Sequence, residues 1–161
     1  MGERVSALAD RFQQARQGFI TTIEGYSPDQ MQANCAGEQC NVTALAAHVA
    51  GVHALAADWV KTAATGGTLP SITMDDVNHM NSEQFARDAR RDKNEILTEL
   101  RTNGEQAEQA LRQLSDADLD RTTQFPLLGG EVTTQQIVEY VLIGDVEGHL
   151  KSISAAGGSA G

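Results

Sequence analysis

Apolar residues recur at helical spacing through most of the chain, and three prolines divide this pattern into four segments. The prolines are Pro28, Pro70 and Pro126. In the first segment, apolar residues form a single stripe made of Val5, Leu8, Phe12, Phe19 and Ile23. In the second segment, the stripe consists of Leu45, His48, Val52, Leu55 and Trp59. Spacings of three and four residues are typical of one face of an α-helix, so both segments are predicted to be amphipathic helices.

Capping residues indicate where the second and fourth helices begin. Asn41 is a favourable N-cap, and the second helix is expected to run from there to about Ala64. Thr133 and Gln136 form a capping box, from which the fourth helix is expected to continue to about Ser154. This last segment is apolar almost all round, which is typical of a central helix or of one that also meets a partner subunit.

The third segment carries apolar residues but also two points at which a helix can break. Asp92 and Glu95 have the spacing of a capping box, so this segment is either one helix or two. Asn103-Gly104 is a second weak point. The apolar positions of the segment are Phe85, Ile96, Leu97, Leu100, Leu111 and Leu114.

These elements predict an all-α fold, a four-helix bundle with long connections. The connections exceed the roughly 2–8 residues typical of helix–helix links, so we expect the loops to shape a mouth on the bundle. A short extended excursion is expected between Thr122 and Val132. One domain is expected over residues 1–155, followed by a flexible C-terminal tail over 156–161, which is rich in Gly, Ala and Ser.

Composition excludes several classes of function. The 161 residues carry 22 acidic and 12 basic side chains and a formal net charge of −10, which leaves no broad basic surface for nucleic acid. Two cysteines cannot form a disulfide scaffold. The most apolar stretch, Val42–Val60, contains Asp58 and two histidines and is typical of a core helix rather than a membrane span. We expect a cytoplasmic protein with no nucleic-acid and no membrane partner.

Two histidines and one carboxylate are candidate metal ligands. His48 interrupts the apolar stripe of the second helix, and Asp145 and His149 continue the stripe of Val138 and Leu142 on the fourth. If these helices are neighbours, the three side chains converge. Three N and O ligands suit a divalent metal and leave a position open for water or substrate. The alternative is an ordinary surface Asp–His pair and a hydrogen-bonded core histidine.

Two motifs resemble the DinB-like proteins. Asn41-Val-Thr-Ala-Leu-Ala-Ala-His48-Val resembles the start of their second helix, where a metal-binding histidine follows a short apolar run. Val141-Leu-Ile-Gly-Asp145-Val-Glu-Gly-His149-Leu resembles their last bundle helix, which carries two further ligands four residues apart. The branch of mycothiol-dependent maleylpyruvate isomerases has Glu at the first of these two places, so Asp145 is closest to that branch but one methylene shorter. Cys40 stands where the family usually has Trp.

The resemblance implies a metal site formed by His48, Asp145 and His149. The divalent metal is expected to be zinc, with nickel as the alternative. The expected function is a thiol transferase or isomerase, in which the metal activates a low-molecular-weight thiol as cosubstrate toward a small-molecule electrophile. No protein nucleophile or general base is assigned. Two alternatives stay open: a metal-dependent hydrolase using the same ligands, and a non-catalytic helical module for dimerisation or partner binding. A homodimer is a further expectation.

The remaining reactive side chains are assigned ordinary roles. His53 and His79 are expected at the surface, although His79 with Asn78 and Asn81 can also lie near the mouth of the bundle. Cys40 is expected to be buried and Cys35 incidental, with a loop disulfide as the alternative. The one basic cluster is expected to be a solvated face, although it can also hold a carboxylate; it comprises Arg87, Arg90 and Arg91.

Overall fold

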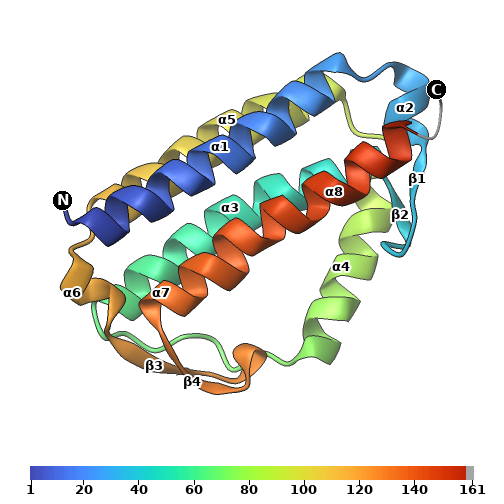
Figure 1. The fold of residues 1–161 in the computed structure, drawn as a ribbon. Coiled ribbons are helices and arrows are strands. Elements are labelled where there is room, and N and C mark those ends of the chain that lie inside the picture. Colours follow the sequence, from blue (N-terminus) through green and yellow to red (C-terminus); the bar gives the residue numbers. More distant parts are fainter. Residues whose placement is uncertain (159–161) are drawn as a thin grey trace.

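The computed structural model describes residues 1–158 and confirms an all-α four-helix bundle. Three of its rods are α1 (Glu3–Gly25), α3 (Val42–Ala64) and α5 (Lys93–Arg112). The fourth rod is continuous and consists of α7 (Thr134–Ile137), a π-helical segment (Val138–Ile143) and α8 (Gly144–Gly158). Figure 1 shows α1 beside α5 and α3 beside α8.

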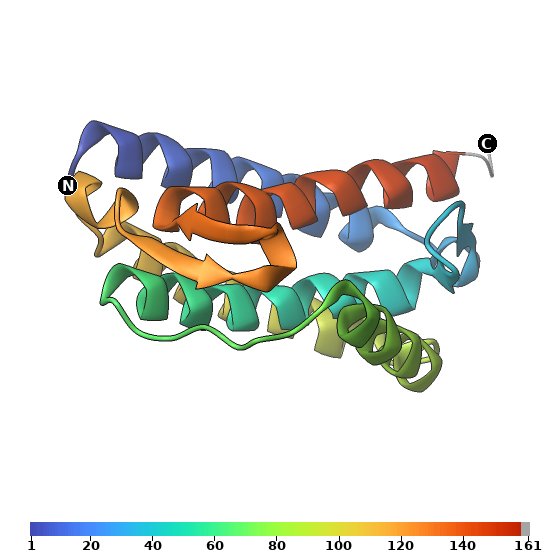
Figure 2. The same ribbon diagram turned by 90° about the horizontal axis from the view of Figure 1, so that it is seen from below.

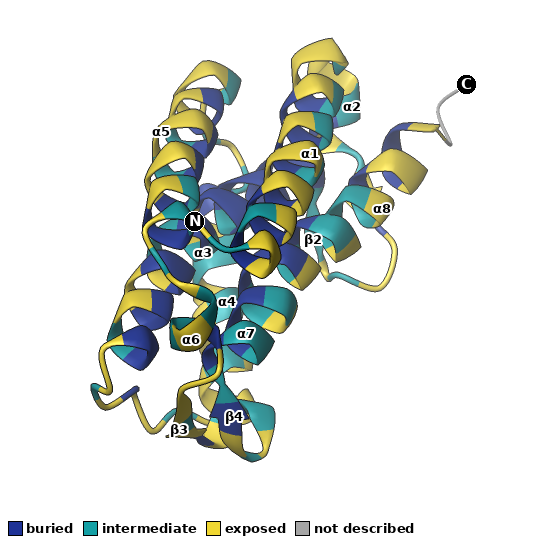
Figure 3. Cartoon of the chain, turned by 60° about the vertical axis from the view of Figure 1, so that its left-hand side comes forward, coloured by how far each residue is buried: buried dark blue, intermediate teal, exposed yellow. Residues whose placement is uncertain are grey.

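The predicted stripe of α1 forms part of the hydrophobic core. All five of its residues are buried, and the largest contributors are Phe12, Phe19 and Ile23. The outer faces of α1 and α5 are exposed and their inner faces buried (Figure 3). Burial of one apolar face per helix is the main force that holds such a bundle together.

A short segment returns the chain from α1 to α3. Helix α2 (Pro28–Gln32) has Pro28 in its first turn, where a missing N–H costs nothing. Strands β1 (Asn34–Cys35) and β2 (Cys40–Asn41) then form a small antiparallel hairpin. At the end of β2, the Asn41 side chain accepts a hydrogen bond from the Ala44 N–H, which confirms it as the N-cap of α3.

The third predicted segment contains two helices. Helix α4 (Met74–Asp88) is opened by a capping box of Thr73 and Asp76, and α5 by Asp92, which accepts a hydrogen bond from the Glu95 N–H. Helix α4 is not one of the four rods. It packs against α3 and crosses the bundle at a steep angle (Figures 1 and 2).

Helix α5 continues through the predicted weak point at Asn103-Gly104. Gly104 is buried against the side chain of Arg16, and a Cβ at this position would lie 2.1 Å from the Arg16 Cδ. Arg16 in turn forms an ion pair of 2.7 Å with Glu108. The glycine therefore serves a close approach between α1 and α5 rather than a break in the helix.

The segment before the last rod forms a β-hairpin, which confirms the predicted extended excursion. Helix α6 (Asp116–Leu119) precedes strands β3 (Thr122–Phe125) and β4 (Gly130–Thr133), which are joined by a 3₁₀ turn at Pro126–Leu128. Phe125 is buried and packs edge-to-face on Trp59 of α3, with ring centroids 5.0 Å apart.

The C-terminal helix is longer than predicted. Helix α8 continues to Gly158, so residues 156–158 are helical where the sequence suggested the start of a tail. The Tyr26 hydroxyl donates a hydrogen bond of 2.5 Å to the Ile153 carbonyl and holds this end against α1. The rest of the expected tail lies outside the described residues. No helix within residues 1–158 has the length and apolar character needed to cross a membrane.

Helix α3 presents a different face to the core from the one predicted. Its deeply buried residues include Val49, Ala50, His53 and Ala56, whereas the predicted stripe turns outward at its centre, with Leu55 41% exposed. The placement of His53 at the surface was therefore wrong. The helix is so rich in alanine that both faces are apolar, and the sequence pattern cannot distinguish them.

His53 is fully buried without a hydrogen bond. Neither ring nitrogen has a partner among the described residues, and the ring packs edge-to-face on Phe12 at 5.2 Å. Burial lowers the pKa of His53 from its ordinary value of 6.5 to about 4. Between these values the unfolded chain binds more protons than the folded one, so this histidine makes stability fall as the pH falls from 6.5 to 4.

Replacement of His53 by Leu should therefore reduce the acid sensitivity of the fold. Wild type is expected to lose about 2 kcal/mol more free energy of unfolding than His53→Leu between pH 7 and pH 5. Urea denaturation at the two pH values measures the difference. His79→Leu, at an exposed histidine, serves as the control and should behave as wild type. Equal pH dependence of wild type and His53→Leu would contradict this assignment.

Candidate metal centre

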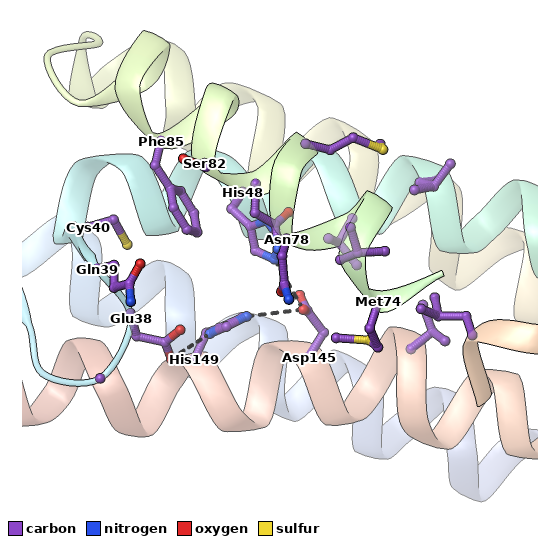
Figure 4. Close-up of a pocket in the computed structure, with 18 of the residues that line it drawn as sticks. Glu38, Gln39, Cys40, His48, Met74, Asn78, Ser82, Phe85, Asp145 and His149 are labelled. Atoms are coloured by element: carbon purple, nitrogen blue, oxygen red, sulfur yellow. Dashed lines mark hydrogen bonds and ion pairs between the residues drawn. The ribbon is translucent and has the colours of Figure 1, made fainter. Parts of the chain in front are cut away.

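The three predicted ligands lie together at the base of a cavity. His48 comes from the first half of α3, and Asp145 and His149 come from successive turns of α8 (Figure 4). The Asp145 Oδ1 lies 3.4 Å from the His48 Nε2 and 3.1 Å from the His149 Nε2. One potential ligand atom from each residue lies within 4.8 Å of the others. The sequence prediction that these residues converge is confirmed.

The carboxylate of Asp145 lies between the two imidazoles and is mostly buried. Its side chain is 16% exposed, and its Oδ2 is buried with no hydrogen-bond partner among the described residues. Burial by itself would raise the pKa of Asp145, but hydrogen bonds and charge from His149 and His48 outweigh it and hold this pKa below its usual value. A buried anion with an unused oxygen and two imidazoles beside it is a donor set that fits a divalent cation.

His149 is affected by the same interaction. Burial by itself would lower the pKa of His149, but the hydrogen bond and charge of Asp145, together with Glu38, raise it above its usual value. The rings of His48 and His149 meet edge-to-face, with centroids 5.1 Å apart and an interplanar angle of 88°. Phe85 of α4 packs on the other side of His48, with a centroid distance of 5.8 Å. Both imidazoles are therefore held in place by packing as well as by Asp145.

The π-helical segment sets the position of Asp145. The Gly144 N–H bonds to the Glu139 carbonyl, five residues earlier, and α-helical geometry resumes at Gly144, directly before Asp145. A Cβ on residue 144 would lie 2.9 Å from the Glu139 oxygen, which explains the glycine. Single π-turns inside α-helices are frequent at functional sites. Helical periodicity alone did not indicate this one.

Glu38 was missed by the sequence reasoning. It lies between β1 and β2, and its Oε1 is 3.1 Å from the His149 Nδ1. The Ser152 hydroxyl donates a hydrogen bond of 2.8 Å to the same oxygen. A carboxylate on one imidazole nitrogen orients the ring and leaves the other nitrogen available, as is usual for histidines that bind metals. Glu38 follows Gly37 in a polar loop far from α8 in sequence, so no local spacing connects it with His149.

The cavity above the cluster has a volume of about 1090 Å³. It is bounded by α3, α4, the last rod and both hairpins, so the long connections shape the mouth as predicted. Asn78 and Asn81 of α4 line it, as proposed from the sequence. His79 does not line it; its side chain is 77% exposed and lies 3.3 Å from Glu83. The surface role predicted for His79 is confirmed.

The burial of the two cysteines differs from what the sequence predicted. Cys35 is buried and Cys40 half-buried, and the two residues lie opposite each other in the β1–β2 hairpin. The expectation of a buried Cys40 and an incidental Cys35 was therefore wrong: Cys35 belongs to the hydrophobic core, and Cys40 packs against that core while staying partly exposed. Both thiols are free. Burial raises the pKa of Cys35 to about 11 and that of Cys40 to about 12.

The arginine cluster is paired with acids. Arg87 lies 3.3 Å from Asp88, and Arg91 lies 2.5 Å from Glu99. Arg90 is exposed. The cluster is thus the solvated face that was expected in the first place, and none of the three residues lines the cavity over the candidate centre.

Comparison with known families identifies the fold. Residues 11–151 match the family model of the DinB superfamily. The chain belongs to the DinB superfamily. This confirms the resemblance inferred from the motifs around His48 and Asp145. No curated protein gives a significant match.

Solved structures share the DinB-like fold. The mycothiol-dependent maleylpyruvate isomerase superposes with a TM-score of 0.72 and 14% identity, over 92% of this chain and 60% of that chain. A histidine-to-alanine variant of an enzyme with the same name superposes with a TM-score of 0.73 and 12% identity, over the same shares. At such identities the likeness shows the fold alone. This chain spans three fifths of the isomerase chain.

The π-turn provides a test of how Asp145 is positioned. In Gly144→Ala the new Cβ must displace the Glu139 carbonyl, which shifts the start of α8 and with it the Asp145 carboxylate. We expect affinity for Zn²⁺ to fall by about 10-fold or more, because ligand geometry tolerates little displacement. Competition titration with a chelating dye measures this. Gly148→Ala is the matched control, since a Cβ there meets open space; equal affinity of the two variants would contradict the role of Gly144.

The hydrogen bond from the hairpin provides a second test. Glu38→Gln keeps an acceptor for His149 but removes the charge that supports it, so the affinity for Zn²⁺ is expected to fall by about 10-fold. The melting temperature of the metal-free protein should change little. Glu105→Gln, at an exposed acid on α5, is the control. If Glu38→Gln binds Zn²⁺ as tightly as Glu105→Gln, Glu38 does not support the centre.

Proposed function

We propose that His48, Asp145 and His149 bind a divalent metal ion and that the protein is an enzyme of the thiol transferase or isomerase type. The observation that carries this proposal is the approach of both imidazole Nε2 atoms to one buried carboxylate oxygen, at the base of a large cavity. Three protein ligands leave a coordination position for a further ligand, which is typical of catalytic rather than structural sites.

Each residue of the centre has a definite part in this proposal. The imidazoles are neutral donors, and Asp145 offsets one charge of the ion. Glu38 holds the tautomer of His149 in which the Nε2 is unprotonated. A divalent ion held there would lower the pKa of a bound thiol and so supply a thiolate at neutral pH. The cavity would hold the electrophile next to that thiol.

The nucleophile is proposed to come from a small thiol rather than from the protein. Cys40 lines the cavity, but burial raises its pKa to about 12, so it is protonated at neutral pH. Cys35 is buried and does not line the cavity. A low-molecular-weight thiol as cosubstrate fits both this arrangement and the name of the isomerase that shares the fold, which is mycothiol-dependent.

The finer points of the proposal concern the ion and its setting. Zinc is proposed as the metal and nickel as the alternative, because both accept two imidazoles and a carboxylate. A cytoplasmic location is proposed, since small thiols are kept reduced there. A homodimer stays a prediction.

Metal analysis of protein purified without a histidine tag tests the centre directly. About one equivalent of a divalent metal per chain is expected in wild type, and almost none in the His48→Ala, His149→Ala double variant. His79→Ala removes an exposed histidine and should keep the full metal content. Wild type without metal, or a double variant with undiminished metal, would contradict the centre and favour the non-catalytic helical module.

A second measurement separates the two enzyme classes. Consumption of an electrophile by the metal-loaded protein is expected only when a small thiol is present, and it should stop in the double variant. Turnover of an ester or amide without thiol, lost in the same double variant, would instead favour the metal-dependent hydrolase.

A further inference from the structure

The lining of the cavity combines apolar side chains with carboxamides. The apolar side chains come from α3, from α4, from the loop between these helices and from the turn between β3 and β4. They include Leu55, Trp59, Ile72, Val77, Leu127 and Leu128. Carboxamide side chains also line the cavity, from Asn34, Gln39, Asn78 and Asn81; the carboxamide of Asn41 lines it too but is engaged in hydrogen bonds with Ala44, Gln32 and Ala89. Such a wall offers apolar contact and neutral donors and acceptors.

Among residues 1–158, no lysine or arginine lines the cavity. Besides the two histidines, the carboxylates of Glu38 and Asp145 are its only ionic side chains within the described residues. Both are acids, and both belong to the candidate centre. Even with a divalent cation in place, the formal charges of the ion and these two carboxylates sum to zero. A substrate carboxylate would therefore meet no net positive charge there.

The arginines of the basic cluster do not change this balance. Arg87, near the end of α4, and Arg91, after it, line an adjoining, smaller depression that shares His48 and Leu55 with the cavity. Their partners Asp88 and Glu99 line that same depression, at 3.3 Å and 2.5 Å. Each guanidinium is thus already engaged by a carboxylate outside the main cavity.

Transfer of an anion from water into such a cavity is unfavourable. A carboxylate loses its hydration on burial, and only a cation or several hydrogen-bond donors offset the free-energy cost of that loss. A neutral molecule loses much less and gains from contact with the apolar wall. We propose that the electrophilic substrate of this protein is an uncharged, mainly apolar molecule with a neutral hydrogen-bonding group, and not a carboxylate.

This inference rests on the proposed function and names the substrate class of the same site. It also separates this protein from the isomerase that shares its fold, since maleylpyruvate is a dicarboxylate. The residues of the cavity wall determine which substrate charge is accepted, and the two chains share only 14% identity. A common fold therefore does not require a common substrate.

A binding experiment with a matched pair of ligands tests the proposal without metal or thiol. Hexanamide and hexanoate have the same shape and differ in charge, and neither absorbs where tryptophan is excited. Trp59 is the only tryptophan of the chain and lines the cavity, so its fluorescence reports binding. Hexanamide is expected to bind about 10-fold more tightly than hexanoate, both in metal-free and in Zn²⁺-loaded protein.

Substitution at Leu55 shows whether charge is the cause. Leu55 is partly exposed at the cavity wall, so a longer polar side chain can be accommodated. Leu55→Lys should reverse the preference toward hexanoate, whereas Leu55→Gln, of similar size but neutral, should keep the preference for hexanamide. Hexanoate binding as tightly as hexanamide in wild type, or no fluorescence change with either ligand, would overturn the proposal. Because this readout needs no metal, it can fail or succeed independently of the metal analysis that tests the proposed function.

Discussion

The burial of one carboxylate constrains much of this structure. Asp145 is an anion inside a helical bundle, and such a group is stable only when hydrogen-bonding or cationic partners replace its lost hydration. Those partners are His48 and His149, which approach the same carboxylate oxygen. Their approach requires α3 and α8 to be neighbours, and it requires α8 to begin in the right register. The π-turn that ends at Gly144 provides that register.

The bundle separates a packed core from an open site. Alanines and aliphatic residues of α3 pack against α5 and His53 contacts Phe12 of α1, while the outward side of the same helix carries His48 and the apolar cavity wall. The connections between the rods, which are long for a helical bundle, complete the site. The β1–β2 hairpin contributes Glu38 to His149, and α4 packs Phe85 on His48. Rigid rods thus hold the candidate ligands, and loops define what can reach them.

Several features were predictable because they depend on local physics. Capping residues such as Asn41 and Asp92 satisfy the first N–H groups of a helix, so helix starts can be read directly from the chain. Asp145 and His149 are predicted to lie on one face because residues four positions apart follow each other by about one helical turn. Local patterns did not decide features that depend on contacts between helices. His53 was placed at the surface because α3 is apolar on both faces. Asn103-Gly104 was named as a weak point of the third segment, but α5 continues through it because Gly104 allows the close approach of Arg16, which is not visible in sequence.

The sequence by itself predicted four segments with helical periodicity, the caps at Asn41, Asp92 and Thr133, and the acidic charge. Spacings of three or four residues also placed His48, Asp145 and His149 on apolar faces, whereas their choice as candidate ligands rested on the resemblance to the DinB-like proteins as well. Only the tertiary structure decided which face of α3 is buried, that Glu38 contacts His149, and that no lysine or arginine of residues 1–158 lines the cavity. These depend on contacts between residues such as 38 and 149, which are more than a hundred positions apart, and no local periodicity records such contacts.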